Sequence, residues 1–421
     1  MNQLRIYNNS INKNKKSFTD QHIIGMSLMF GLFMPNGSFF YFLVPVVILI
    51  LGLRYSTLNS IYNSTKFILI FLMLLSLMIF AAKNSDQLDI KGLLRNLVIF
   101  ELIFFFPFVK NVQIPNIYLY FGLIFIFISQ ISYMLGIGSV ISFFNNTYPY
   151  EGDAYYYQSD YLIANGVDMS LTNRSFRLGG LFLNPNQCAR YLTILLAIFL
   201  CENYNKKFKS ILPFLIICFL AIISTGSRTG FLIMALMILW YIYKRVASKG
   251  RIYKNLLIVA IILLTTVFIL SVGELSKTMR FLDFDEGVDK SLFMKIQIFI
   301  DYLSNNTGFI QILFGNFSND GSSAIQFDSE WGDLFYRYGF LFLITFILFY
   351  ILIYKNTAPK YRLFFLILLW VVSSTLVLSY RAGFVFLLFL SKYTHHSWQD
   401  VNNKKLFIKL KRDTNKIQIK E

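Results

Sequence analysis

The chain has 421 residues, of which 56% are hydrophobic, 18% aromatic and only 14% charged, and its formal net charge is +17. This composition excludes a fold around one soluble core and predicts a polytopic integral membrane protein. Because lipid cannot satisfy free backbone groups and the apolar runs are too long for barrel strands, we expect an all-α fold with about twelve transmembrane helices.

The chain begins with a polar, basic segment, residues 1–21, that lacks the apolar region and cleavage site of a signal peptide. We expect it to be a cytoplasmic tail. A single membrane domain then covers residues 22–394, and a basic cytoplasmic tail covers residues 395–421. The apolar runs predict spans at 22–35, 38–53, 66–82, 93–110, 116–139, 182–201, 210–226, 229–245, 254–272, 333–354, 361–379 and 381–394.

Lys and Arg in alternate connections orient these spans. With both termini in the cytoplasm, the cytoplasmic segments hold 26 basic and 5 acidic residues, and the rest of the chain holds 13 and 17. Because basic residues resist translocation, this distribution predicts the orientation and explains the net charge. We expect attraction to anionic lipid and no nucleic-acid partner. The three cysteines, Cys188, Cys201 and Cys218, show no disulfide or metal-ligand spacing and are assigned to packing.

Two predicted outer segments are much longer than the others, about 140–181 and about 273–332. The first contains Tyr155, Tyr156 and Tyr157 beside acidic residues. Such a cluster suits either stacking on sugar rings or an aromatic belt at the lipid headgroups, and both interpretations stay open. The second contains a stretch at 288–304 whose apolar residues recur at helical spacing, which predicts a helix on the outer membrane surface.

Several arginines fall on the outer side, against the general bias of basic residues. One such arginine alone is as easily an interfacial anchor as a ligand contact. As a group they favour an anionic ligand such as a lipid-linked diphosphate, because the guanidinium fork matches phosphate oxygens. The arginines in question are Arg174, Arg177, Arg190, Arg228, Arg337 and Arg381.

Three stretches resemble the O-antigen polymerase and O-antigen ligase superfamily. They are RLGGLFLNPNQCARYL at 177–192, TGSRTGFL at 225–232, and DSEWGDLFYRYGFL at 328–341, the last preceded by ILFGNFS at 312–318. The resemblance covers about 175–345 and rests on the order, the spacing and the common outer placement of these motifs.

The resemblance implies a membrane glycosyltransferase, with no metal or cofactor expected, that takes a glycan from undecaprenyl diphosphate at the outer face of the bacterial plasma membrane. It implies that Arg228 and Arg177 contact the diphosphate, and that the Asn184-Pro185-Asn186 turn frames the site. Where family members carry an arginine in the large-loop helix this chain has Lys295, so that contact passes to Lys295 or Arg280.

Histidine separates the two branches of this superfamily. Ligases carry an outer-face histidine at the position that Asp328 occupies here, whereas His22, His395 and His396 all map to the cytoplasmic side. Asp328, Glu330 and Asp333 are the candidate bases, and Asp328 is preferred for its position.

We therefore expect a polymerase of repeat units for O-antigen, capsule or a similar surface polysaccharide. The alternatives are a ligase-like glycan transferase and, from another class, a polysaccharide-unit flippase or transporter. The expected partners are the undecaprenyl-diphosphate-linked oligosaccharide and the bilayer, with a flippase and a chain-length regulator as candidate protein partners.

Overall fold

The computed structural model describes residues 20–33, 113–147, 178–182, 185–247, 297, 300–301, 308–315, 330–373, 382–390 and 392–393. Every regular element in these ranges is a helix, which confirms the all-α class for the part of the chain described. Two of the described helices are long and apolar enough to cross a membrane, Asn116–Met134 and Tyr338–Lys355, and Phe208–Ser224 is a shorter apolar helix. The predicted spans 38–53, 66–82, 93–110 and 254–272 lie outside the described residues, so the twelve-span topology stays a prediction.

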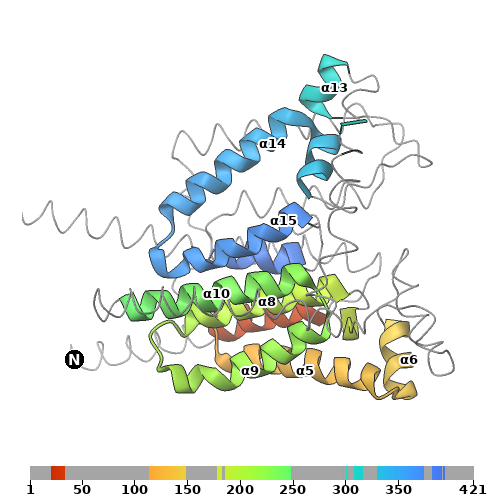
Figure 1. Ribbon diagram of the computed structural model, residues 1–421, viewed down its shortest axis with the longest axis vertical. Coiled ribbons are helices and arrows are strands. Elements are labelled where there is room, and N and C mark those ends of the chain that lie inside the picture. The colour runs from red at the N-terminus through yellow and green to blue at the C-terminus, as the bar shows by residue number, and fades with distance from the viewer. Residues whose placement is uncertain are drawn as a thin grey trace, which may run out of the picture.

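Four helices form the centre of the fold and lie side by side in Figure 1: α5 (Asn116–Met134), α8 (Pro185–Glu202), α9 (Phe208–Ser224) and α10 (Arg228–Ala247). The middle position belongs to α8, which contacts the other three and also η6 (Pro359–Leu369). All residues from 188 to 201 of α8 are buried. A helix with apolar residues on every side is typical of a position inside a bundle, which is where α8 lies.

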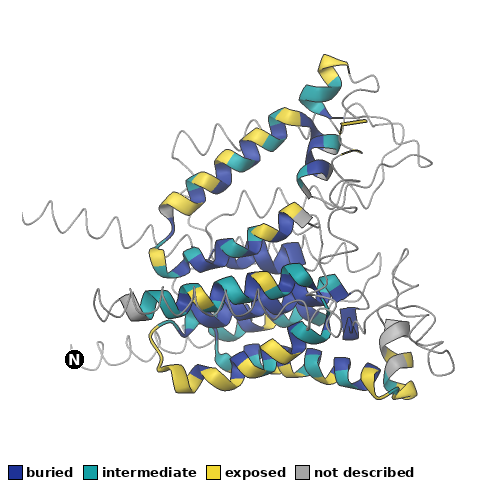
Figure 2. Cartoon of the chain, in the orientation of Figure 1, coloured by how far each residue is buried: buried dark blue, intermediate teal, exposed yellow. Residues whose placement is uncertain are grey.

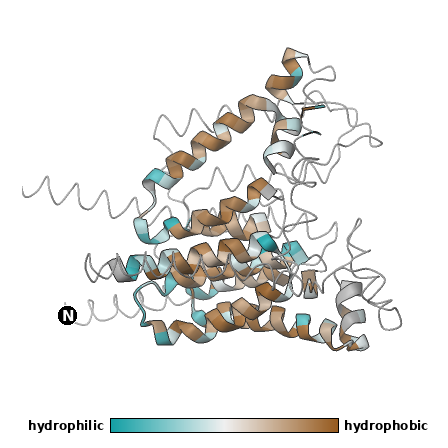
Figure 3. Cartoon of the chain, viewed as in Figure 1, coloured by the Kyte–Doolittle hydropathy of each residue, from teal (hydrophilic) through white to brown (hydrophobic). Residues whose placement is uncertain are grey.

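The helices run in alternating directions between two ends of the bundle. Cations gather at one end, which we call the lysine end and define by Lys206, Lys207, Lys209, Lys355 and Lys360. There the exposed α8–α9 connection lies beside the C-terminus of α10, since the Arg245 guanidinium bonds the Lys206 carbonyl. Figure 3 shows this as hydrophilic colour at the connections on the left and hydrophobic colour along the helices.

The opposite end of the bundle, which we call the arginine end, is defined by Arg190 and Arg228. The helices α5 and α9 end near it, and α8 begins there. The contacts of Gln130 in α5 show this, since its side chain bonds the Ala221 carbonyl of α9 and contacts Cys188 of α8. Among the described residues, these lysines therefore lie at one end of the bundle and these two arginines at the other.

Three helices leave apolar side chains uncovered along their length. On α5 these are Ile117, Phe121, Ile124 and Ile128, which are 42–70% exposed. Corresponding stripes lie on α9 and on α14 (Glu330–Asn356), and Figure 2 shows them as exposed bands on those helices: Leu212, Ile216, Phe219, Leu220, Phe340, Ile344, Leu348 and Ile351. Each stripe recurs every three or four residues, so one whole face of each helix is apolar and uncovered.

Several predicted boundaries need correction. The predicted span 116–139 ends at Met134, because the chain turns at Gly136 (φ 67°) and begins a second helix, α6 (Gly138–Thr147). That helix occupies the start of the predicted outer loop 140–181. The predicted span 182–201 begins as an α-helix only at Pro185, after a short 3-10 turn, η4 (Gly180–Phe182).

Two further spans differ in their internal geometry. The predicted span 361–379 starts as the 3-10 helix η6 and becomes α-helical only at α15 (Trp370–Ser373). The predicted span 333–354 corresponds to α14, which is interrupted at Gly339 (φ 80°). A side chain at Gly339 would collide with the Leu313 carbonyl, so the backbone of a second segment, α13 (Phe309–Phe314), takes the space at this break.

Candidate functional site

Arg228 stands at the first position of α10, directly after a tight turn. Gly226 adopts φ 59°, and the Thr225 hydroxyl both donates to the Ile222 carbonyl (2.6 Å) and accepts from the Ser227 N–H (3.2 Å). The Ser227 hydroxyl then accepts from the Gly230 N–H at 3.3 Å, as the side chain before a helix commonly does. Arg228 itself is half-buried. Its backbone is therefore fixed by a capped helix start rather than carried on a long loop.

Arg190 belongs to the same end of the bundle through a close helix contact. A Cβ placed on Gly230 of α10 would lie 2.8 Å from the Cβ of Ala189 on α8, so the two backbones approach closely here. Arg190 follows Ala189 directly, and Arg228 lies two residues before Gly230. The backbones of the two arginines therefore lie close along the chain to one point of contact between α8 and α10.

The environment of Arg190 differs from that of a lipid-facing anchor. The residue is 2% exposed, and its guanidinium carbon lies 5.6 Å from the centre of the Trp370 ring. The Trp370 indole donates to the Thr193 hydroxyl (3.0 Å), which in turn donates to the Arg190 carbonyl (2.7 Å). A guanidinium that reached out to the lipid headgroups would be exposed, so interfacial anchoring does not account for Arg190. A charged side chain buried to this extent needs specific partners, which makes Arg190 a candidate functional residue.

The RLGGLFLNPNQCARYL and TGSRTGFL motifs meet in space. The Leu178 N–H donates to the Ser224 carbonyl at 2.8 Å, which places the start of the first motif against the end of α9. Leu178 and the η4 turn are buried, whereas the sequence analysis placed 178–181 in an outer loop. Burial is possible because these backbone groups find partners in α5 and α9. Asn186 lies in the first turn of α8 and is partly exposed.

The other two motif segments also meet. In the ILFGNFS stretch, the backbone of Leu313 and Gly315 lies against Gly339 of the DSEWGDLFYRYGFL stretch. Glu330 begins α14, and Arg337 lies two residues before the break at Gly339. Only the backbone is described at Glu330 and Arg337, so the directions of their side chains stay predictions.

The remaining predicted site residues lie outside the described part of the chain. They are Arg174, Arg177, Asn184, Arg280, Lys295, Asp328, Arg381, Tyr155, Tyr156 and Tyr157.

The predicted surface helix at 288–304 is described at 297, 300 and 301, where the chain is helical and Ile300 is 50% exposed. Within the described residues, no group of three or more His, Cys, Asp or Glu side chains could hold a metal ion. The three cysteines are buried, in agreement with a packing role.

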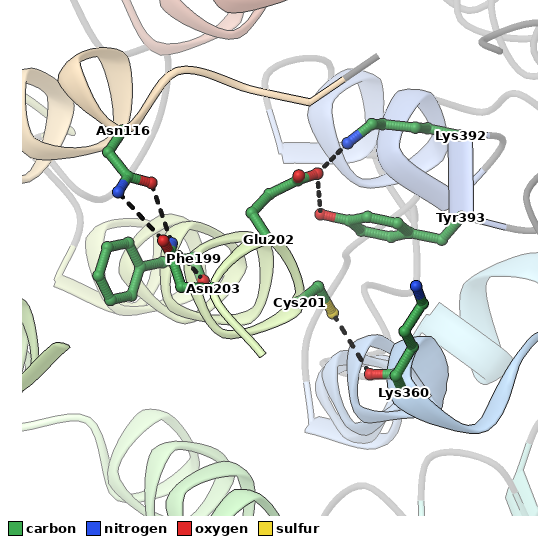
Figure 4. Close-up of polar contacts among 8 residues, drawn as sticks. All are labelled: Asn116, Phe199, Cys201, Glu202, Asn203, Lys360, Lys392 and Tyr393. Carbon is green, nitrogen blue, oxygen red and sulfur yellow. Dashed lines mark hydrogen bonds and ion pairs between the residues drawn. The ribbon is translucent and has the colours of Figure 1, made fainter. Parts of the chain in front are cut away.

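A polar cluster at the lysine end was missed by the sequence analysis. Glu202 at the end of α8 forms an ion pair with Lys392 (Figure 4). Both side chains are at most 8% exposed. The Tyr393 hydroxyl lies 3.4 Å from the same carboxylate oxygen. Nearby, Asn116 and Asn203 exchange two hydrogen bonds of 3.0 Å. Glu202 and Lys392 are 190 positions apart, so their pairing has no local signal in the sequence.

No known protein family, curated protein or solved structure matches this chain.

Proposed function

We propose that this chain is a multi-pass protein of the bacterial plasma membrane. Lipid is the solvent that best explains the uncovered apolar faces of α5, α9 and α14, since faces of this length would make a water-soluble protein aggregate. The lysine end supports a cytoplasmic location for its connections. Two described helices have the length and composition of membrane spans.

Within that membrane, the function proposed is polymerisation of undecaprenyl-diphosphate-linked oligosaccharide repeat units on the outer face. The observation that carries this proposal is that Arg190 and Arg228 belong to the two helices that meet at the Ala189–Gly230 contact. Two guanidinium groups supported by packed helices, at the end away from the lysines, suit a diphosphate group at the membrane boundary. The resemblance of three sequence stretches to O-antigen polymerases and ligases supports the same reaction class.

The reaction forms a bond from an acceptor hydroxyl oxygen of the incoming lipid-linked unit to the anomeric carbon of the growing glycan. The bond from that carbon to the diphosphate oxygen breaks, and undecaprenyl diphosphate leaves with the electron pair. Guanidinium groups at a partly dehydrated boundary stabilise the negative charge that develops on the leaving oxygens. The hydroxyl proton passes to a carboxylate, for which Asp328 and Glu330 are the candidates.

Reconstitution tests this proposal directly. The purified protein in proteoliposomes should convert lipid-linked repeat units into longer glycans and release undecaprenyl diphosphate. Transfer of glycan to a lipid A core without lengthening would favour the ligase-like alternative. Absence of any new glycosidic bond would contradict both transferase functions.

A second candidate function, export of lipid-linked units or another solute, is favoured by the buried Glu202–Lys392 ion pair. Ionisable pairs within membrane helices recur in transporters, where they bind coupling ions or relay protons. An assay can separate the two candidate functions. A transporter moves its substrate across the bilayer and leaves its covalent structure unchanged, whereas a polymerase forms new glycosidic bonds.

A further inference from the structure

The strongest unassigned feature of the arginine end is Gln130. It lies in the last quarter of α5, a helix without a charged residue, and is 1% exposed. An amide inside such a helix is costly unless its polar groups find partners. The Gln130 Nε2 group does so across helices: it donates to the Leu178 carbonyl at 3.2 Å and to the Ala221 carbonyl at 3.0 Å.

These two carbonyls belong to the two segments that lead into the arginines. Leu178 precedes η4 and the start of α8, which carries Arg190, and Ala221 lies in the last turn of α9 before the turn that positions Arg228. An amide NH₂ group has two hydrogens, so the two carbonyls use both of its donors. The Cys188 sulfur lies 3.5 Å from the same nitrogen, which places the start of α8 against this amide.

The neighbouring residue strengthens the same junction. The Ser129 hydroxyl accepts from the Leu181 N–H at 3.1 Å while donating to the Ile126 carbonyl at 2.6 Å. Gly180 adopts φ 55°, and a side chain there would collide with the Ser129 hydroxyl. Consecutive side chains of α5 therefore hold the buried turn before α8 at two places.

We propose that Gln130 is a positioning residue that sets the separation of Arg190 and Arg228, and thereby the diphosphate-binding geometry of the site. This inference rests on the proposed function for its ligand, but the geometry it invokes is testable without that ligand. The hydrogen bonds of Gln130 go to Leu178, Ala221 and Cys188 and not to either arginine. It acts by tying the backbone before α8 to the backbone before α10.

The first experiment measures the junction itself. In full-length protein in lipid nanodiscs, with Cys201→Ala and Cys218→Ala leaving Cys188 as the single thiol, Gln130→Leu should raise the rate of maleimide labelling of Cys188 about tenfold or more. Ser132→Ala is the matched control, because the Ser132 hydroxyl bonds only the Ile128 carbonyl of its own helix. Ser129→Ala, which removes one acceptor, should give a smaller rise. Labelling that is unchanged in Gln130→Leu and Ser129→Ala would overturn the inference.

The second experiment measures binding of undecaprenyl diphosphate, without any sugar, to wild type, Gln130→Leu, Arg228→Lys and the double variant. If Gln130 acts through the placement of Arg228, the two losses of affinity should not multiply. The double variant should then bind undecaprenyl diphosphate at most about twofold more weakly than whichever single variant binds it less tightly. Losses that multiply would show that Gln130 has only a structural role.

The two experiments separate the possible failures. Faster Cys188 labelling in Gln130→Leu combined with no binding of undecaprenyl diphosphate by wild type would contradict the proposed function and the positioning role, while leaving the junction itself established. Binding by wild type with Cys188 labelling that Gln130→Leu does not change would contradict the inference and leave the proposed function standing.

Discussion

Ala189 and Gly230 bring α8 and α10 so close that a Cβ on Gly230 would stand 2.8 Å from the Ala189 Cβ. Real Cβ atoms essentially never approach that closely, so one helix would have to shift. The backbone of Gly230 does not require glycine, because its φ is not positive. The need for glycine here comes from packing, and the packing determines how Arg190 and Arg228 lie relative to each other.

Gly230→Ala should therefore destabilise the protein and impair the site. The extra methyl group overpacks the α8–α10 contact, at a cost of about 1–3 kcal/mol that exceeds the gain in helix propensity. Thermal unfolding in detergent should show a lower midpoint. Gly138→Ala in α6 is the matched control, because a Cβ there meets nothing within 4 Å. Equal midpoints for the two variants would contradict the close contact.

Arg228→Ala should abolish polymer formation without loss of membrane insertion. Removal of one oriented donor to a developing negative charge typically lowers the rate by about 10²–10³. Arg228→Lys should restore only part of the activity, because lysine keeps the charge and loses the bidentate fork. Polymer yield per inserted protein is the measurement. Normal polymer from Arg228→Ala would make this residue an interfacial anchor.

The orientation of the bundle is testable with single cysteines in a cysteine-free background. Lys207→Cys lies in the exposed connection at the lysine end and should react with an impermeant maleimide only after the cells are permeabilised. Gly138→Cys lies at the exposed start of α6, beyond the end of α5, and should react in intact cells. Labelling of both from the same side would contradict the topology.

Local composition was enough to predict two neighbouring helices closely. The apolar runs placed α9 at 210–226 and α10 at 229–245, within two residues of the helices Phe208–Ser224 and Arg228–Ala247. The predicted spans leave only 227–228 between them, which requires a sharp turn before Arg228, and the structure forms it with the Thr225 and Ser227 hydroxyls and with Gly226 at φ 59°.

Features that depend on distant segments were missed. The break at Gly339 follows from the backbone of Leu313, which the sequence does not place beside it. Burial of the turn before α8 depends on Gln130, some fifty positions earlier. A lone amide in an apolar run was a signal that could have been used, since such a group needs partners. Its two carbonyl partners still had to come from the structure.

Removal of one charge of the Glu202–Lys392 ion pair should destabilise the protein, whereas removal of both charges should be tolerated. Lys392→Met leaves the Glu202 carboxylate buried without its cation, and breaking a buried pair in this way typically costs about 3–5 kcal/mol. The double variant Glu202→Gln with Lys392→Met removes both charges and should recover most of the unfolding midpoint, because two neutral side chains need no compensation.

The same double variant separates the two candidate functions. A polymerase that uses this pair only to join α8 to the 382–393 segment should retain its activity once the fold is stable. A transporter that uses the pair as a coupling site should lose transport even though the protein is fully folded. The measurements are polymer formation and substrate uptake in proteoliposomes prepared from the same purified protein. Loss of polymer formation at wild-type stability would contradict a purely structural role for the pair.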